Sequence, residues 1–212
     1  MKKFDSLLYF ITDSTGMSED DFLHTVRRAL DGGVTMVQLR EKEKTTREYI
    51  HLAQKLHAIT SEYKVPLIID DRLDVALASD AEGVHLGQTD MPVDTARSIL
   101  GEHMIIGATA KTVCQAVEAY NMGADYLGVG AIYPTTTKVK TVITPVSVLS
   151  EICKSVPIPV NAIGGLNTEN SDVLSDVDID GICVVSAIMK SDNPYLAAHS
   201  LKQKAIELTN RR

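Results

Sequence analysis

Short apolar runs alternate with stretches of helical period along the whole chain, and this alternation constrains its fold more than any other feature. Eight runs rich in β-branched residues predict strands, and eight amphipathic stretches predict helices. The strands are predicted at Leu8 to Ile11, Val34 to Leu39, Leu67 to Ile69, Gly83 to Leu86, Met104 to Gly107, Tyr126 to Val129, Ile158 to Val160 and Gly181 to Val185. The helices are predicted at about 19–31, 46–61, 72–79, 93–100, 112–121, 146–154, 168–176 and 194–208.

The strand runs are almost continuously apolar, as expected of parallel strands that are covered on both faces. Eight strand and helix units within 212 residues predict an α/β fold, a compact (β/α)8 TIM barrel. An open doubly wound sheet is the alternative, although such a sheet usually has about five to seven strands. The chain has no linker, low-complexity segment or interior change of composition, which predicts a single domain over residues 1–212.

The formal net charge of −7 argues against broad binding to nucleic acid or to an anionic membrane. Any phosphate group must therefore be bound by a local set of cations. The cysteines Cys114, Cys153 and Cys183 are far apart and lack metal-ligand spacing, so we expect reduced thiols. No apolar run reaches membrane-spanning length, and Leu7 to Ile11 is too short for a signal peptide, so a soluble cytoplasmic protein is expected. The sequence is compatible with a homo-oligomer.

Polar residues follow the predicted strands, at the ends where (β/α)8 barrels carry their reactive groups. The second strand continues into Gln38-Leu39-Arg40-Glu41-Lys42, where alternation places Gln38, Arg40 and Lys42 on one face. Two cations and an amide at one spot could clamp a diphosphate through charge-assisted hydrogen bonds. Alternatively, the run is a solvated strand end whose cations are neutralised by Glu41 and Glu43.

The third and fourth predicted strands end in acidic residues, Asp70-Asp71 and Gln88-Thr89-Asp90. Two carboxylates from neighbouring strand ends suit Mg²⁺, which typically takes one or two carboxylates and completes its coordination with water and substrate phosphate. Alternatively, Asp71 and Asp90 are the N-caps of the helices that follow.

Later loops suggest a second anion site. Gly164-Gly165 follows the seventh strand, and Val185-Ser186 follows the eighth and precedes a short helical stretch at Ala187 to Lys190. In many barrels these two loops bind phosphate through backbone N–H groups. The loop after the sixth strand carries Pro134-Thr135-Thr136-Thr137-Lys138 and could close over a substrate, although threonine-rich surface loops are common. Two separated anion sites imply two phosphorylated substrates.

His85 is the one histidine at a predicted strand end, whereas the five others fall in or beside predicted helices. A packed, hydrogen-bonded role near the site and an acid/base role are both compatible with this position.

Five motifs resemble thiamine phosphate synthases in their order and spacing. They are Gln38 to Lys42, Asp70 to Arg72, Gly83 to Asp90, Tyr126 to Lys138 and Ile163 to Leu166. The resemblance covers essentially the whole chain. It implies a (β/α)8 barrel that joins the pyrimidine of 4-amino-5-hydroxymethyl-2-methylpyrimidine diphosphate to a thiazole phosphate, giving thiamine phosphate and diphosphate by dissociative displacement.

The resemblance also implies roles for individual residues. The pyrimidine diphosphate would be held by Gln38, Arg40, Lys42, Thr109 and Lys138. The thiazole phosphate would be held by Thr135, Thr137, Gly165, Val185 and Ser186. The wider set of expected substrate contacts adds Leu39, Glu41, Asp70, His85, Thr136 and Gly164. Asp71 and Asp90 would bind Mg²⁺, which with the catalytic cations Arg40, Lys42 and Lys138 would stabilise the charge developing on the leaving diphosphate.

Four positions depart from the pattern of the family. Asp70 stands where asparagine usually contacts the pyrimidine, so an acid here could change the preferred protonation or ring. Thr109 replaces a serine and keeps its hydroxyl. Thr89 replaces an acidic neighbour of Asp90, which makes the metal site less negative, and the stretch from Val139 to Pro145 differs from the usual loop.

Two other functions are weighed against the synthase. A thiazole tautomerase is a related barrel that needs only a phosphate site and an acid/base group. A non-catalytic binder of thiamine-pathway phosphates would hold its ligand without releasing diphosphate. A tautomerase has no use for Arg40, Lys42, Asp71 and Asp90 as a diphosphate and metal-binding set, so their joint presence favours the synthase over it. Asp70 keeps the binder as an alternative, and metal-dependent turnover separates a binder from the synthase.

Overall fold

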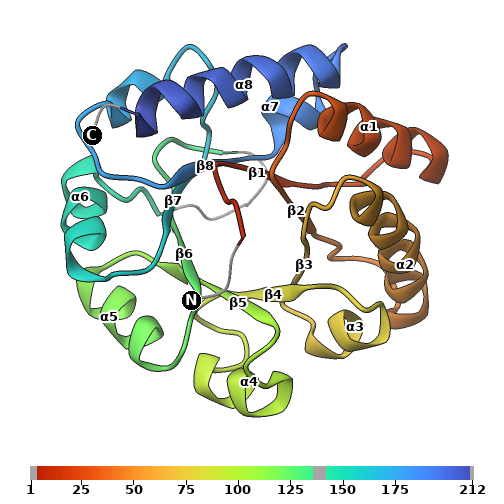
Figure 1. The fold of residues 1–212 in the computed structure, drawn as a ribbon, viewed down its shortest axis with the longest axis horizontal. Helices are drawn as coiled ribbons and strands as arrows, with labels where there is room; N and C mark the ends of the chain where they lie inside the picture. The colour runs from red at the N-terminus through yellow and green to blue at the C-terminus, as the bar shows by residue number, and fades with distance from the viewer. Residues whose placement is uncertain (1–3, 136–141, 211–212) are drawn as a thin grey trace.

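The computed structural model describes residues 4–135 and 142–210 of the chain. In this part, eight parallel strands close into a barrel in chain order, from β1 (Leu8–Ile11) to β8 (Gly181–Val184), and β8 pairs with β1 (Figure 1). Because every strand has two hydrogen-bonded neighbours, the sheet has no free edge. The predicted (β/α)8 barrel is confirmed, and the alternative of an open doubly wound sheet is wrong.

The strands lie close to the predicted runs, with one exception. Between β1 and β8 they are β2 (Met36–Leu39), β3 (Leu67–Asp70), β4 (Gly83–Leu86), β5 (Ile105–Ala110), β6 (Tyr126–Gly130) and β7 (Val160–Ile163). The exception is β7, which begins where the predicted strand ends. Pro157 and Pro159 explain this shift, because a proline has no N–H to donate to a sheet. The carbonyl of Pro159 accepts from the N–H of Leu127 at 2.9 Å, so it takes part only as an acceptor.

Helices follow the strands and surround the barrel (Figure 1). They are α1 (Glu19–Asp31), α2 (Thr46–Glu62), α3 (Leu73–Ala78), α4 (Val93–Leu100), α5 (Val113–Asn121), α6 (Val146–Ser155), α7 (Ser186–Met189) and α8 (Pro194–Thr209). The predicted helix over 168–176 is wrong, since only the 3₁₀ turn η1 (Ser171–Leu174) forms there. The side chain of Asn167 accepts the backbone N–H groups of Glu169 and Asn170, each at 2.9 Å, and such local bonds compete with an α-helix.

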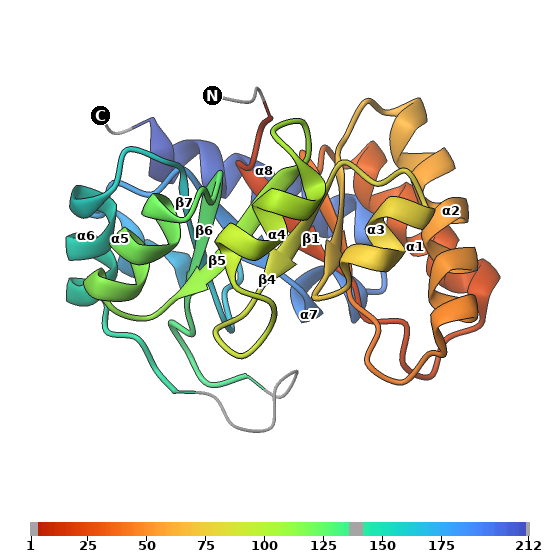
Figure 2. The same cartoon turned by 90° about the horizontal axis from the view of Figure 1, so that it is seen from below.

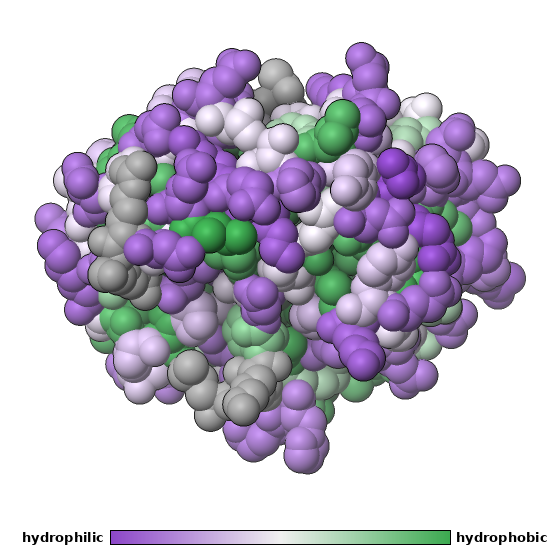
Figure 3. Space-filling model, turned by 45° about the horizontal axis from the view of Figure 1, so that its top comes forward, coloured by the Kyte–Doolittle hydropathy of each residue, from purple (hydrophilic) through white to green (hydrophobic). Residues whose placement is uncertain are grey.

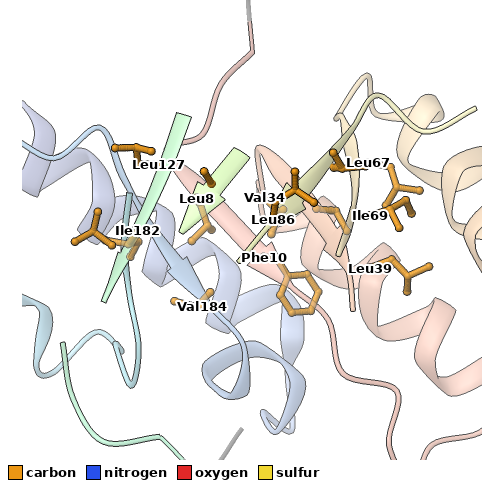
Figure 4. Packing of buried hydrophobic residues seen from close by; sticks show 14 of the residues in the cluster. Leu8, Phe10, Val34, Leu39, Leu67, Ile69, Leu86, Leu127, Ile182 and Val184 are labelled. Carbon is orange, nitrogen blue, oxygen red and sulfur yellow. The ribbon is translucent and has the colours of Figure 1, made fainter. Parts of the chain in front are cut away.

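Two layers of apolar side chains hold the barrel together. The outer layer lies between strands and helices, and Figure 4 shows Leu8, Leu67 and Leu127 among its strand residues. The inner layer fills the barrel and consists of Tyr9, Ile11, Met36, Ile68, Ile105, Tyr126 and Cys183. Successive residues of a strand face opposite sides, so each strand supplies both layers. Because the interior is packed, a ligand site must lie at one end of the barrel.

Hydrophilic residues predominate on the face of the molecule shown in Figure 3. No helix in the described part of the chain is long and apolar enough to cross a membrane. The segments that follow the strands gather at one end of the barrel, and Figure 2 shows residues 131–135, directly after β6, extending from that end. This is the end where the polar motifs of the sequence meet.

Candidate active site

A cavity of about 180 Å³ opens where the eight strands end. Each strand, or the segment directly after it, contributes to its lining. Most of the predicted site residues that the structure describes line this cavity: Gln38, Arg40, Asp70, His85, Thr109, Thr135, Gly164, Gly165, Val185 and Ser186. Thr136, Thr137 and Lys138, together with residues 139–141 of the divergent loop, lie outside the described residues. The sequence motifs therefore converge on one place, although they come from distant parts of the chain.

The side chains of Leu39 and Glu41 face away from the cavity, contrary to a side-chain role for them in the predicted substrate contacts. Leu39 is fully buried in the outer apolar layer. The Glu41 carboxylate accepts a hydrogen bond of 2.8 Å from Ser14 and lies 3.6 Å from the ammonium of Lys44. Burial raises the pKa of Glu41, and its Oε1 has no hydrogen-bond partner among the described residues. The alternation of side chains along β2 and its extension explains both orientations.

Two cations and a buried carboxylate lie together where β2 and β3 end, and of these Arg40 and Asp70 line the cavity whereas Lys42 does not. The ammonium of Lys42 lies 2.7 Å from the Asp70 carboxylate and also contacts Asp71, while Arg40 Nε lies 3.8 Å from Asp70. Burial, reinforced by the charge of Asp71, raises the pKa of Asp70, although Lys42 opposes this shift. Burial also opposes the charge of Lys42, but the two carboxylates outweigh it and raise the pKa of Lys42. Asp70 thus neutralises part of the predicted diphosphate clamp.

Asp71 and Asp90 lie together at the ends of the neighbouring strands β3 and β4. Partial burial and the nearby Asp71 carboxylate raise the pKa of Asp90, and Asp90 Oδ2 accepts from the N–H of Gly87 at 2.7 Å. The alternative that these residues are N-caps is wrong, because Arg72 and Pro92 occupy the cap positions of α3 and α4. Within the described ranges, no group of three or more acidic, histidine or cysteine side chains could hold a metal. Two carboxylates nevertheless match the number that Mg²⁺ usually takes from a protein.

A hydrogen-bonded chain of amide, phenol, imidazole and hydroxyl side chains forms the floor of the cavity. Gln38 Nε2 donates to the hydroxyl of Tyr9 at 2.6 Å, and this hydroxyl lies 2.8 Å from that of Tyr126. His85 joins the chain through Nδ1, 3.1 Å from the Tyr126 hydroxyl, and through Nε2, 3.0 Å from the Thr109 hydroxyl. The histidine therefore has the packed, hydrogen-bonded position that was one of its two expected roles. It orients Thr109, which lines the cavity.

Sequence reasoning missed Tyr9, Tyr126 and Lys111. The two tyrosines lie within strand runs that read as plain apolar core, and their contact is between residues 117 positions apart. Lys111 follows the end of β5 and lines the cavity. The sequence could have indicated Lys111, because Lys111 stands two residues after Thr109 and the two side chains therefore lie on the same face of an extended chain.

Gly164 and Gly165 form a tight turn against the loop that follows β6. Their φ angles are +105° and +66°, values that residues with a side chain rarely adopt. A Cβ atom at Gly164 would lie 2.3 Å from the Cβ of Ala131, so only glycine fits there. After the neighbouring strand β8, Val185 precedes the first residue of α7, Ser186, where backbone N–H groups have no intrahelical acceptor. Backbone N–H groups from the β7 and β8 segments can therefore reach an anion in the cavity.

Comparison with known proteins relates the chain to one family. The sequence model described as thiamine monophosphate synthase matches residues 8–188. A Methanobrevibacter smithii protein named thiamine-phosphate synthase is 50% identical over 201 residues, which span 95% of this chain and 96% of that protein. A Streptococcus pneumoniae protein named thiamine-phosphate synthase 2 is 52% identical over 186 residues, or 88% of this chain and 89% of its own. The solved structure of thiamine phosphate pyrophosphorylase from Pyrococcus furiosus has a TM-score of 0.87 at 40% identity, covering 95% of this chain and 96% of that one.

Proposed function

The chain belongs to the thiamine monophosphate synthase family and is a thiamine-phosphate synthase, and we propose that the cavity at the ends of its strands carries the whole reaction in the presence of Mg²⁺. It joins the pyrimidine of 4-amino-5-hydroxymethyl-2-methylpyrimidine diphosphate to a thiazole phosphate. The observation that carries the proposed site is the placement of two different anion-binding arrangements around one cavity. Because strands from both ends of the described chain close this barrel, we infer one domain.

The floor of the cavity suits an aminopyrimidine ring. Because Gln38 Nε2 is used by Tyr9, the Gln38 Oε1 atom is left to accept from an exocyclic amino group. When His85 Nε2 donates to Thr109, the hydrogen of the Thr109 hydroxyl is free to donate to a ring nitrogen. One acceptor and one donor therefore face a ring that offers the complementary pair.

The diphosphate belongs at the wall formed by the segments after β2, β3 and β4. Arg40 and Lys42 would bind its oxygens through charge-assisted hydrogen bonds, and Lys138, which lies outside the described residues, remains a proposed third cation. Asp71 and Asp90 would hold Mg²⁺, which when bound supplies Lewis-acid stabilisation of the leaving group. Entry of the diphosphate would draw Lys42 from Asp70 and Asp71 towards the substrate, which also releases Asp71 for the metal.

Two separate anion sites suit a reaction between two phosphorylated substrates. Departure of diphosphate breaks the bond to the pyrimidine methylene carbon and leaves a cation, which the thiazole nitrogen attacks to form the new bond. The Gly164-Gly165 turn and the start of α7 would hold the thiazole phosphate on the opposite side of the cavity. Ile11, Ile163 and Val184 line the space between, and apolar walls help to keep water from quenching the cation.

No strong base needs to remove a proton in this scheme. Burial raises the pKa of Tyr9 and of Tyr126 well above the ordinary value, so both hydroxyls stay neutral and act as hydrogen-bond donors and acceptors only. The relatives named thiamine-phosphate synthase, at about half identity over most of the chain, weigh against the tautomerase and binder alternatives.

The decisive experiment incubates the purified protein with both substrates, with and without Mg²⁺, and measures thiamine phosphate and diphosphate. Equal amounts of both products that vanish on chelation, and return on adding Mg²⁺, are expected. Undiminished turnover in excess chelator would refute the metal proposal. Isomerisation of the thiazole phosphate alone, followed by NMR without the pyrimidine substrate, would favour a tautomerase instead.

A further inference from the structure

We propose that Lys111 is a further substrate-binding residue of this chain and binds the diphosphate of the pyrimidine substrate. This inference rests on the proposed function and adds a cation that lies outside the five sequence motifs. Lys111 directly follows β5 and, among the residues that the structure describes, is one of three aspartate, arginine or lysine residues that line the cavity, with Arg40 and Asp70.

The strand that precedes Lys111 directs its side chain into the barrel. Ala108 and Ala110 belong to the outer layer that faces the helices. Gly107 faces the interior, where a Cβ atom would lie 2.1 Å from the ring of Tyr126, and Thr109 bonds to His85. Lys111 continues the inward series of Gly107 and Thr109 by one more step of two residues.

Within residues 4–135 and 142–210, no carboxylate forms an ion pair with Lys111. Asp70 lies near both Arg40 and Lys42, and Lys42 also contacts Asp71, so the motif cations already have anionic partners inside the protein. In the part of the chain that the structure describes, the Lys111 ammonium forms neither an ion pair nor a hydrogen bond with a protein group. A half-buried cation at a cavity wall gains most when an anion enters. Asp70 partly neutralises Arg40 and Lys42, and Lys111 adds positive charge that compensates for this.

The position of β5 in the barrel selects the diphosphate rather than the thiazole phosphate. β5 pairs with β4, whose following segment carries Asp90. That segment also contacts the end of β5 directly, because Gln88 Nε2 donates to the carbonyl of Thr109 at 2.6 Å. The Gly164-Gly165 turn and α7 follow β7 and β8, which are farther around the barrel. Lys111 therefore flanks the two metal-binding carboxylates on the side away from Arg40 and Lys42.

The test compares Lys111→Met and Lys111→Arg with Lys154→Met, an exposed lysine near the end of α6 at the opposite end of the barrel. Initial rates are measured against each substrate, and binding of inorganic diphosphate with Mg²⁺ is measured by calorimetry. Loss of one charged hydrogen bond predicts that Lys111→Met raises KM for the pyrimidine diphosphate and Kd for diphosphate by about 10- to 100-fold. KM for the thiazole phosphate should stay within about twofold, Lys111→Arg should recover most of the loss, and Lys154→Met should match the parent protein.

A double-mutant cycle with Asp70→Asn tests the charge relationship itself. When Asp70 no longer competes for Arg40 and Lys42, the penalty of Lys111→Met should be at least about threefold smaller than in the parent background. Unchanged diphosphate affinity in Lys111→Met, or an equal rise of both KM values, would overturn the proposal. Because calorimetry needs no turnover, the result also stands apart from the proposed reaction, which fails only if the parent protein makes no thiamine phosphate.

Discussion

The hydroxyl groups of Tyr9 and Tyr126 meet at 2.8 Å inside the barrel and connect opposite sides of the cavity floor. Tyr9 accepts from Gln38, so its own hydrogen must go to Tyr126, the one further partner it has among the described residues. In the neutral His85 tautomer that carries its proton on Nε2, Tyr126 donates to Nδ1 and Nε2 donates to Thr109. In this arrangement the hydroxyl hydrogens of Tyr9 and Tyr126 and the imidazole hydrogen of His85 each form one hydrogen bond. With this tautomer, Gln38 Oε1 and the hydrogen of the Thr109 hydroxyl are left for the cavity that both residues line.

Replacing Tyr9 with phenylalanine should loosen this floor. The change leaves Gln38 Nε2 buried without an acceptor, which costs about 1–3 kcal/mol of the free energy of unfolding. Because the Gln38 amide loses its orientation, we expect KM for the pyrimidine diphosphate to rise several-fold, with KM for the thiazole phosphate little changed. Urea denaturation and initial rates measure both effects. Tyr195→Phe is the matched control, since the Tyr195 ring contacts Arg28 and its hydroxyl has no hydrogen bond within the described ranges. Equal stability of the Tyr9 and Tyr195 variants would contradict this account of the floor.

Gly164→Ala should damage the thiazole-phosphate side of the cavity. The added methyl would lie 2.3 Å from Cβ of Ala131 and would push the segments after β6 and β7 apart. We expect KM for the thiazole phosphate to rise by about tenfold or more, together with a stability loss on the order of 3 kcal/mol from strain and clash. Gly101→Ala separates these causes. Its φ is also positive, at +67°, but a Cβ there meets no atom within 4 Å. It should therefore lose about 1–3 kcal/mol without changing KM, and a shift of KM in this variant would weaken the argument from the clash.

Asp71→Asn and Asp90→Asn should each raise the Mg²⁺ concentration that gives half-maximal rate. Loss of one of two carboxylate ligands is expected to cost about 1.4 kcal/mol or more of metal affinity, which is about tenfold. Titration of the initial rate with Mg²⁺ measures the change. Asp94→Asn, in the exposed first turn of α4, removes the same charge close by and should leave the titration unchanged. A Mg²⁺ curve that is the same in all three variants would rule out the proposed metal ligands.

Leu56→Ala should destabilise the protein far more than Leu77→Ala. Leu56 lies on α2 and is fully buried in the outer layer, whereas Leu77 on α3 is 51% exposed. The buried change should reduce the free energy of unfolding by about 2–5 kcal/mol, because it removes packed methyl groups and leaves a cavity. The exposed change should stay within about 0.5 kcal/mol. Urea unfolding of the two variants gives the difference directly, and similar values would mean that the outer layer is not packed as described.

Cys183 should resist alkylation although it lines the cavity. It is 2% exposed, and burial raises the pKa of its thiol, so little of the reactive thiolate forms at pH 8. Cys114 on α5 is exposed and should react first with iodoacetamide. Mass spectrometry of the partly labelled protein identifies the order, and denatured protein should label at all three cysteines. Labelling of Cys183 as fast as Cys114 in the folded protein would show that the interior of the barrel opens readily.

The local pattern of the sequence determined the barrel and the residues at the ends of its strands. Apolar runs of about four residues, each followed by an amphipathic stretch, reflect backbone geometry that repeats every few residues. For the same reason, alternation correctly placed Gln38 and Arg40 on one face. The predicted seventh strand was misplaced because Pro157 and Pro159 disturb the repeat before β7. The predicted helix over 168–176 was wrong because the Asn167 side chain bonds to the backbone before η1.

Only the tertiary structure decided which polar groups pair inside the site. The contacts of Tyr9 with Tyr126 and of Lys42 with Asp70 join different strands, and strand register with barrel closure brings them within hydrogen-bond distance. The same closure shows that Lys111 belongs to the cavity and that Leu39 and Glu41 point away from it. Sequence periodicity reports the face of one strand. The partner of a side chain depends on how eight strands stagger around a common axis, which no local pattern contains.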